Sequence, residues 1–493
     1  MFKKTALSLL VTSVITGCGG GPSGSESTQT TQPLQPNAPV VETTGFFTAV
    51  ADKLPVFKDY LNSISNECNI VFPIVNLIDL NLDGKKDLVV HLSCILPSNL
   101  WGSVKTDAPN DALMVFLQQH DGKFVFSNEQ VFGKKEVRIQ GNTRKAVSAD
   151  FNNDGYPDLA YAVNREDGRT GDGSVMAAQS VVMLSEGSGK YKVDALGTPD
   201  WFHSVDAIKN SEGYYDVIFA GFNGSVSQSF RNKDGKWMSL GNYYPDVSAS
   251  TFRAISDGKT IITDMGNSHV GNSASIVKYS LDNQLWSKSD QYIVTGFLVP
   301  FVTYNTSLSQ AFAVNVGNET HIGAGYEESC FLKLYPDTQV FIGKKNSEIV
   351  PSYTQGRNVT HNINNQIITL DAFKFQDKIE KLPSIFENED KKASFNDIKC
   401  KDVNNDGYDD LVVSKFGNNE GVIVYLNNKQ GKLVKLDPSN FPKSYTDNPY
   451  QSSSGIYEDV NGDGIPDLLV WSIDGSKTPL MYKGIKHPTL DNK

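Results

Sequence analysis

Four short segments of the chain repeat one spacing of oxygen-bearing side chains, D-x-N-x-D-G-x-x-D-L, and they begin at Asp79, Asp150, Asp402 and Asp459. A hard cation such as Ca²⁺ takes about six to eight oxygen ligands at roughly 2.3–2.6 Å. Side chains at positions 1, 3 and 5 of a tight loop converge on one point, and position 7 offers its backbone carbonyl. The Gly at position 6 supplies the positive φ of a sharp reversal, and the Asp at position 9 closes the shell. The repeat therefore predicts about four Ca²⁺ sites.

We name these segments by their first residues, as loop 79, loop 150, loop 402 and loop 459. Each contributes two acidic side chains and one amide at positions 1, 3 and 5, a carbonyl at position 7 and a third carboxylate at position 9. The predicted ligands are Asp79, Asn81, Asp83, Lys85 and Asp87, then Asp150, Asn152, Asp154, Tyr156 and Asp158, then Asp402, Asn404, Asp406, Tyr408 and Asp410, and finally Asp459, Asn461, Asp463, Ile465 and Asp467.

The residues that follow the loops distinguish the metal site from two other interpretations. An EF-hand places a bidentate Glu at position 12 and continues into a helix. Here position 12 is Val90, Tyr161, Val413 or Val470, and the runs after the loops, such as LVVHL and LLVWSI, are typical of strands. This excludes the EF-hand. An Asx-rich hairpin turn without metal is the remaining alternative, and four copies of one spacing favour the metal site.

The elements that position the loops are predicted to be strands. An apolar strand recurs seven times between residues 113 and 482, and several copies are followed by a turn and an aromatic or apolar residue. Asp150 follows Asp79 by 150 − 79 = 71 residues, which suits a four-stranded antiparallel unit with its connections. We therefore expect an all-β fold, a β-propeller of seven four-stranded blades over residues 65–490, because ring closure removes exposed sheet edges. Separate sandwich domains are the alternative.

A fifth, degraded copy of the acidic loop lies between residues 208 and 217. It keeps Asn210, Glu212, Gly213 and Asp216 at positions 3, 5, 6 and 9, but Ile208 stands at position 1. Without the first carboxylate, this copy is not expected to ligate a cation.

At the four loops the sequence resembles the FG-GAP/VCBS repeat family, the bacterial relatives of the integrin α-chain propeller. The resemblance implies that each acidic loop joins the first and second strands of a blade and binds Ca²⁺. It also implies that the ligand-binding face lies on the opposite side of the propeller. The integrin-type Phe-Gly and Gly-Ala-Pro signature is not evident here, so an integrin-like partner is not inferred.

The N-terminus reads as an export signal followed by a tether. Lys3 and Lys4 precede an apolar run that is too short to span a bilayer, and Ile15-Thr16-Gly17-Cys18 resembles the lipobox of bacterial lipoproteins. The resemblance implies cleavage after residue 17 and lipidation of Cys18, with the Gram-negative outer membrane favoured as the destination. Residues 18–44 are rich in Gly, Pro, Ser, Thr and Gln, and we expect a disordered tether there.

Apolar residues at helical spacing in residues 45–64 predict a short helical segment that packs on the propeller. Four cysteines remain after Cys18, and an even number in an oxidising compartment suggests two disulfides. Four cysteines allow three connectivities, of which the pairs nearest in sequence are favoured, Cys68 with Cys94 and Cys330 with Cys400.

The remaining composition narrows the function. The net charge of −11 argues against a nucleic-acid partner, and no HExxH, GxSxG or phosphate-binding glycine motif occurs. We therefore expect a calcium-binding envelope lipoprotein that acts as a binding or adhesion module for a protein or glycan, with the membrane met only through its lipid anchor. The alternatives are a polysaccharide-active enzyme resembling the lyases found on some calcium-bearing propellers, and a structural subunit of an envelope assembly.

Overall fold

The protein is described here from a computed structural model. It describes residues 43–50, 54–62, 69–95, 111–139, 141–164, 177–221, 225–246, 251–254, 257–264, 274–294, 313–316, 319–322, 326–335, 338–351, 366–375, 378–382, 385–386, 394–416, 422–442, 453–472 and 475–490. The predicted signal peptide, Cys18 and the tether up to residue 42 lie outside these residues, as do Cys68 and the side chains of Cys94 and Cys330. No helix in the described part of the chain is long and apolar enough to cross a membrane.

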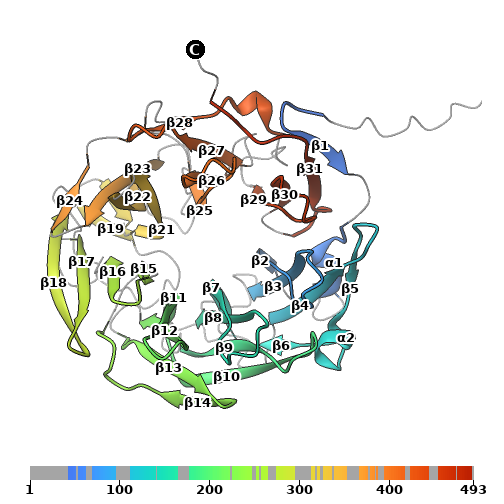
Figure 1. Cartoon of the computed structure of the whole chain (residues 1–493), viewed down its shortest axis with the longest axis horizontal. Helices are drawn as coiled ribbons and strands as arrows, with labels where there is room; N and C mark the ends of the chain where they lie inside the picture. Colours follow the sequence, from blue (N-terminus) through green and yellow to red (C-terminus); the bar gives the residue numbers. More distant parts are fainter. Residues whose placement is uncertain are drawn as a thin grey trace, which may run out of the picture. The chain divides into compact units, whose positions relative to one another are not determined.

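The described residues form seven β-sheets whose strands pair antiparallel, together with short helices (Figure 1). Four sheets each consist of four strands that follow one another in the chain. They are β7 (Asn142–Ala149), β8 (Asp158–Asn164), β9 (Ala178–Ser185) and β10 (Tyr191–Asp200); β11 (Phe202–Lys209), β12 (Tyr215–Gly221), β13 (Gln228–Lys233) and β14 (Lys236–Ser239); β15 (Thr251–Ala254), β16 (Thr260–Asp264), β17 (Ala274–Asp282) and β18 (Leu285–Val294); and β25 (Ser394–Lys401), β26 (Asp410–Phe416), β27 (Val422–Asn427) and β28 (Leu433–Lys435).

Two further sheets have the same order with one modification each. The first is β2 (Asn69–Ile78), β3 (Asp87–Ile95), β4 (Asp111–Gln118) and β5 (Phe124–Phe126), with β6 (Arg138–Ile139) added against β4. The second is β29 (Ser453–Glu458), β30 (Asp467–Ser472) and β31 (Leu480–Gly484), and its fourth strand is β1 (Phe47–Val50) from the other end of the described chain. Six sheets thus have the four-stranded order of a propeller blade.

The expectation of seven four-stranded blades is wrong at the remaining sheet. It contains β19 (Ala313–Val316), β20 (Glu319–Ile322), β21 (Tyr326–Tyr335), β22 (Thr338–Pro351), β23 (Gln366–Phe375) and β24 (Ile379–Lys381). Here β22 is fourteen residues long and pairs along its length with β20, β21 and β23. A strand that long offers edges to more partners than a blade strand does, so this sheet has six strands and lacks the order of the other six.

The sheets contact one another in sequence and close into a β-propeller. Contacts run from β3 to β7, from β8 to β11, from β11 to β15, from β15 to β21, from β21 to β25 and from β26 to β29. The last sheet meets the first through a shared apolar cluster in which Ile456, Leu469 and Trp471 pack with Leu77 and Leu88. Such clusters lie between the blades because each strand alternates its side chains between its two neighbours.

Residues 45–64, where a helical segment is predicted, contain strand β1 and the six-residue helix α1 (Phe57–Asn62). Phe47 is fully buried and its ring lies 5.6 Å from that of Tyr457, which explains why this stretch joins the sheet of β29–β31. Phe57 is also fully buried and packs against Phe116. Two further short helices are α2 (Asn128–Phe132) and a 3₁₀ turn at Pro438–Asn440.

Candidate metal-binding loops

Each acidic loop connects the first and second strands of a blade, as the resemblance implies. Loop 79 lies between β2 and β3, loop 150 between β7 and β8, loop 402 between β25 and β26, and loop 459 between β29 and β30. In each case the Asp at position 9 is the first residue of the second strand. The strands therefore fix both ends of every loop.

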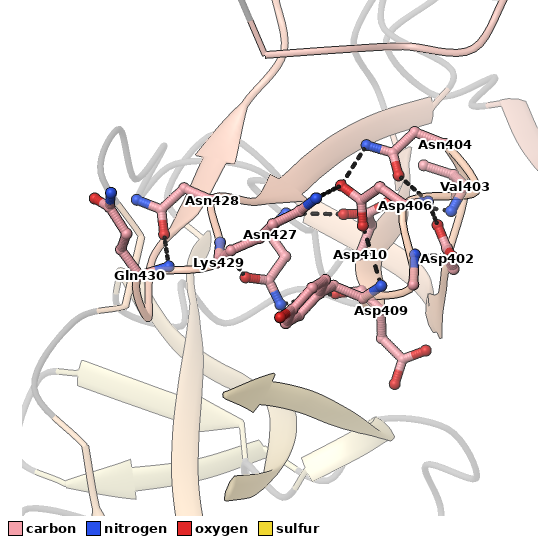
Figure 2. A network of polar contacts seen from close by, with 12 residues as sticks. Asp402, Val403, Asn404, Asp406, Asp409, Asp410, Asn427, Asn428, Lys429 and Gln430 are labelled. Atoms are coloured by element: carbon pink, nitrogen blue, oxygen red, sulfur yellow. Dashed lines mark hydrogen bonds and ion pairs between the residues drawn. The ribbon is translucent and has the colours of Figure 1, made fainter. Parts of the chain in front are cut away.

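Loop 402 shows how the backbone holds the predicted ligands (Figure 2). The carboxylate of Asp402 accepts the N–H groups of Asp406 at 3.0 Å and Gly407 at 2.8 Å. The side-chain oxygen of Asn404 accepts the N–H of Asp406 at 3.2 Å, and the carboxylate of Asp406 accepts the N–H of Tyr408 at 3.0 Å. Positions 1, 3 and 5 are thus turned toward their own loop.

The other three loops repeat this pattern of hydrogen bonds. In loop 79, Asp79 accepts from the amides of Asp83 at 3.0 Å and Gly84 at 2.9 Å. Loop 150 and loop 459 have the same two bonds between position 1 and the amides of positions 5 and 6. The position-5 carboxylate accepts the position-7 amide at 2.9 Å in each of these three loops. Identical spacing in the sequence has therefore produced one backbone conformation four times.

The Asp at position 9 is buried and ties the loop to the third strand of its blade. Asp158 is 1% exposed and accepts the N–H of Phe151 at 2.7 Å and that of Ser185, the last residue of strand β9, at 2.6 Å. The other three position-9 residues make the two corresponding bonds. Both carboxylate oxygens are therefore already occupied by backbone donors, a role that the repeat spacing alone does not reveal.

The loops concentrate negative charge with little compensation. The pKa of the Asp158 carboxyl is raised to about 7, first by burial and then by the charges of Asp154 and Asp150, against the lowering effect of its two backbone donors. The pKa of Asp410 is raised to about 7, and those of Asp87 and Asp467 to about 6, first by burial and with the same carboxylate contributions. A cation in the loop would relieve this repulsion.

Two lysines lie beside position-5 carboxylates in two of the loops. Lys429 Nζ is 3.2 Å from Asp406 in loop 402, and Lys483 Nζ is 3.0 Å from Asp463 in loop 459. Both lysine side chains are about half exposed, so each pair is screened by solvent and contributes little to stability.

Position 4 of the loop has a conformational requirement that the repeat spacing did not predict. Its residue has a positive φ in all four loops, 57° at Leu82, 57° at Asn153, 55° at Asn405 and 78° at Gly462. Asn and Gly tolerate this left-handed conformation, whereas Leu adopts it only with backbone strain. Two Asn and one Gly at this position were the available signal.

The four loops are linked to one another in the order 402, 459, 79 and 150. Asn405 Nδ2 donates to the carbonyl of Gly464 at 3.2 Å, which joins the first two of these loops. The hydroxyl of Tyr191 lies 3.1 Å from the carbonyl oxygen of Leu80 and 3.0 Å from that of Pro157, so its one O–H group is shared between the last two loops. The loops therefore occupy four consecutive blades and extend across the junction between the last sheet and the first.

Among the described residues, no group of three or more His, Cys, Asp or Glu side chains has the arrangement of a metal site. The hydrogen bonds explain this, because position 3 is an amide and the position-9 carboxylate faces backbone donors. The donor set left by each loop is two carboxylates, one amide oxygen and one backbone carbonyl, with position 9 behind them. All of these are oxygens of the kind that Ca²⁺ takes.

The residues that carry this geometry match a known repeat. A family model for the FG-GAP-like repeat matches residues 79–161 and 402–475. Each matched stretch begins at position 1 of a loop, and together the two contain all four loops. The chain carries FG-GAP-like repeats. The FG-GAP-like loops are thus the acidic loops described above, set on a β-propeller.

Several solved structures align with most of the chain. They include the rhamnogalacturonan lyase YesW (11% identity, 85% of this chain and 72% of that chain, TM-score 0.39) and the rhamnogalacturonan lyase of Bacillus licheniformis (12%, 85% and 75%, 0.37). Sqt1 of Chaetomium thermophilum is another (10% identity, 86% and 96%, TM-score 0.44). No curated protein matches the chain.

Proposed function

We propose that the four FG-GAP-like loops bind Ca²⁺, and that the propeller they stiffen is a binding module for a protein or glycan at the cell envelope. The observation that carries this proposal is the recurrence of one hydrogen-bonded loop conformation in four consecutive blades, each with three carboxylates close together. A turn without metal needs only acceptors for its amides, which an amide side chain supplies as well as a carboxylate does, yet positions 1 and 5 are Asp in all four loops.

The ligands would be the side-chain oxygens of positions 1, 3 and 5 and the carbonyls of Lys85, Tyr156, Tyr408 and Ile465 at position 7. When bound, Ca²⁺ supplies positive charge that offsets the repulsion among the loop carboxylates. The chain's own contribution is to hold positions 1 and 5 by amide hydrogen bonds, so little rearrangement is needed on binding. Because such a site is not formed in the unfolded chain, binding adds to the stability of the folded state.

The binding-module part of the proposal draws on the N-terminal sequence. Cleavage before Cys18 and lipid attachment would place the propeller outside the inner membrane, on a tether of about 26 residues that spans roughly 30 Å as a flexible coil. On such a tether, the face opposite the FG-GAP-like loops is the surface we assign to the ligand. We further propose that Cys68 pairs with Cys94, and Cys330 with Cys400, in that oxidising compartment.

The calcium proposal is tested by thermal unfolding of the full chain with excess Ca²⁺ and with excess chelator, alongside measurement of bound calcium. We expect about four Ca²⁺ per chain, and a melting temperature more than about 10 °C lower in chelator, since saturating ligand stabilises only the folded state. Asp154→Ala should lower the bound calcium by about one equivalent. Asp194→Asn is the matched control, because Asp194 is a partly exposed acid on β10 outside every loop.

An unchanged melt in chelator, with no calcium in the purified protein, would overturn the calcium proposal. The binding-module proposal has its own test, a glycan array and an envelope-extract pull-down, each with and without Ca²⁺. Retention of a glycan or protein without product release supports the module. Turnover of a polysaccharide that is abolished by one substitution outside the loops would show an enzyme instead.

A further inference from the structure

The β11–β12 hairpin of the fifth, degraded loop is one residue shorter than the FG-GAP-like loops. Ile208 pairs in the sheet with Asp216, whereas in loop 79 the residue before position 1, Ile78, pairs with Asp87. Ile208, at position 1, is therefore a strand residue, buried at 1% exposure, and it offers no side-chain oxygen to a cation. The loss of the first carboxylate thus coincides with the loss of the loop's first turn.

The later half of the fifth loop is preserved in part, although the N–H of Tyr214 at position 7 donates to Asn210 and not to the position-5 carboxylate. Asn210 accepts the N–H of Glu212 at 2.9 Å, as position 3 does for position 5 elsewhere. Gly213 has a φ of 91°, in the range of the position-6 glycines. Asp216 is fully buried, as the other position-9 residues are. Two acidic positions, 5 and 9, therefore remain in a blade that has lost position 1.

Arg231 on β13 binds both of these carboxylates. Its Nε is 2.7 Å from Asp216 Oδ1, its Nη2 is 2.9 Å from Asp216 Oδ2, and its Nη1 is 3.1 Å from Glu212 Oε1. Asp216 also accepts hydrogen bonds from the Tyr244 hydroxyl at 2.7 Å and from Asn210 Nδ2 at 3.0 Å. One guanidinium thus lies between positions 5 and 9, with only 13% of the Arg231 side chain exposed.

The strand register shows that this arginine occupies a defined position. Arg231 pairs directly with Asp216, the residue at position 9. In three FG-GAP-like loops the residue at the same register position is a leucine, and in loop 459 it is a lysine. These residues are Leu117, Leu184, Leu426 and Lys483. Among these five blades, a basic residue at this register contacts both position 5 and position 9 only in the blade that has lost position 1.

We propose that the Arg231 guanidinium takes the place of the divalent cation in the blade of β11–β14, so that this blade is closed by an internal cation while the four FG-GAP-like loops depend on Ca²⁺. This inference rests on the proposed calcium binding. A bidentate arginine–carboxylate pair supplies charge and directed hydrogen bonds where a metal would supply charge and coordination. In this blade the third-strand residue that pairs with position 9 supplies the cation.

The test is amide hydrogen exchange of the full chain, read by mass spectrometry on peptides that cover each loop, in Ca²⁺ and in chelator. In the wild type, chelator should speed exchange by at least about tenfold in loops 79, 150, 402 and 459 and leave residues 209–215 unchanged. Arg231→Leu, which installs the residue of the metal loops, should speed exchange at residues 209–215 by about a hundredfold with and without Ca²⁺. The reason is that it leaves the Asp216 carboxylate buried without its cationic partner.

Arg231→Lys keeps the charge but loses the bidentate hydrogen bonding of the guanidinium, and we expect an intermediate rise in exchange in the same segment. This variant carries the test if Arg231→Leu does not fold. Arg138→Leu is the matched control, a strand arginine whose partner Glu136 is exposed, and it should leave residues 209–215 unchanged. Calcium-dependent exchange at residues 209–215 of the wild type overturns the inference. If the exchange rates of all five segments are the same in chelator as in Ca²⁺, the calcium proposal on which this inference rests is overturned instead.

Discussion

The backbone N–H of Lys86 donates to the carbonyl of Val460 across 3.2 Å, and this bond joins the first FG-GAP-like loop of the chain to the last. The two loops are separated by more than 370 residues in the sequence but lie in adjacent sheets. Ring closure at this junction therefore involves the loops as well as the apolar cluster beneath them. Any change that moves loop 79 or loop 459 acts on the closure of the propeller.

Gly462→Ala tests the contact between these two loops. A Cβ at residue 462 would lie 2.8 Å from the carbonyl oxygen of Gly84, and the residue has a φ of 78°. We expect a loss of about 2–4 kcal/mol in the free energy of unfolding, from left-handed strain together with the clash. Gly464→Ala is the control, because it has a similar φ of 82° and no atom near its Cβ. Equal losses in the two variants would show that the loop contact contributes nothing.

Asp158→Asn separates the structural role of position 9 from metal binding. Both oxygens of Asp158 accept backbone N–H groups, so an amide NH₂ must face one of these donors. We expect a loss of about 1–3 kcal/mol in the free energy of unfolding, in chelator as well as in Ca²⁺. Asp154→Asn should lower the melting temperature only in Ca²⁺, since Asp154 keeps its acceptor oxygen for the amide of Tyr156. A loss confined to Ca²⁺ for both variants would contradict the backbone role.

The repeat spacing predicted the strands beside the loops because a short apolar run directly after an acidic turn is typical of a β-strand. It did not predict the role of Asp158 as an acceptor of two amides, since one of them, Ser185, comes from a strand 27 residues away. The role of Arg231 was hidden for the same reason, because its pairing with Asp216 depends on strand register. Contacts that depend on the pairing register of distant strands cannot be predicted from a local sequence pattern.

The six-stranded sheet and strand β1 show a second limit. Apolar residues in the segment that contains Phe47 fit helical spacing, but Phe47 is buried between Phe441 and Tyr457, which belong to the opposite end of the chain. Tertiary burial overrides the local preference there. Residues 313–381 lack an acidic loop to mark strand ends, so the long strand β22 could not be foreseen from spacing.

Phe47→Ala tests how much strand β1 contributes to closure. Phe47 is fully buried, with its ring 5.5 Å from that of Phe441 and 5.6 Å from that of Tyr457. We expect a loss of about 3–5 kcal/mol in the free energy of unfolding, from lost burial and the cavity left behind. Thr48→Ala is a milder control on the same strand, as Thr48 is only partly buried. A small, equal change in both would show that β1 contributes little to the stability of the last blade.

Leu82→Asn tests the conformational requirement at position 4. Leu82 has a φ of 57° and is 52% exposed, so its side chain contributes little burial while its backbone is strained. Asn tolerates this conformation and already stands at position 4 of loops 150 and 402, as Asn153 and Asn405. We expect a gain of about 0.5–1 kcal/mol in the free energy of unfolding, present in Ca²⁺ and in chelator. The reverse change, Asn153→Leu, should cost a similar amount, and a destabilised Leu82→Asn would show instead that the leucine side chain makes a favourable contact on the loop surface.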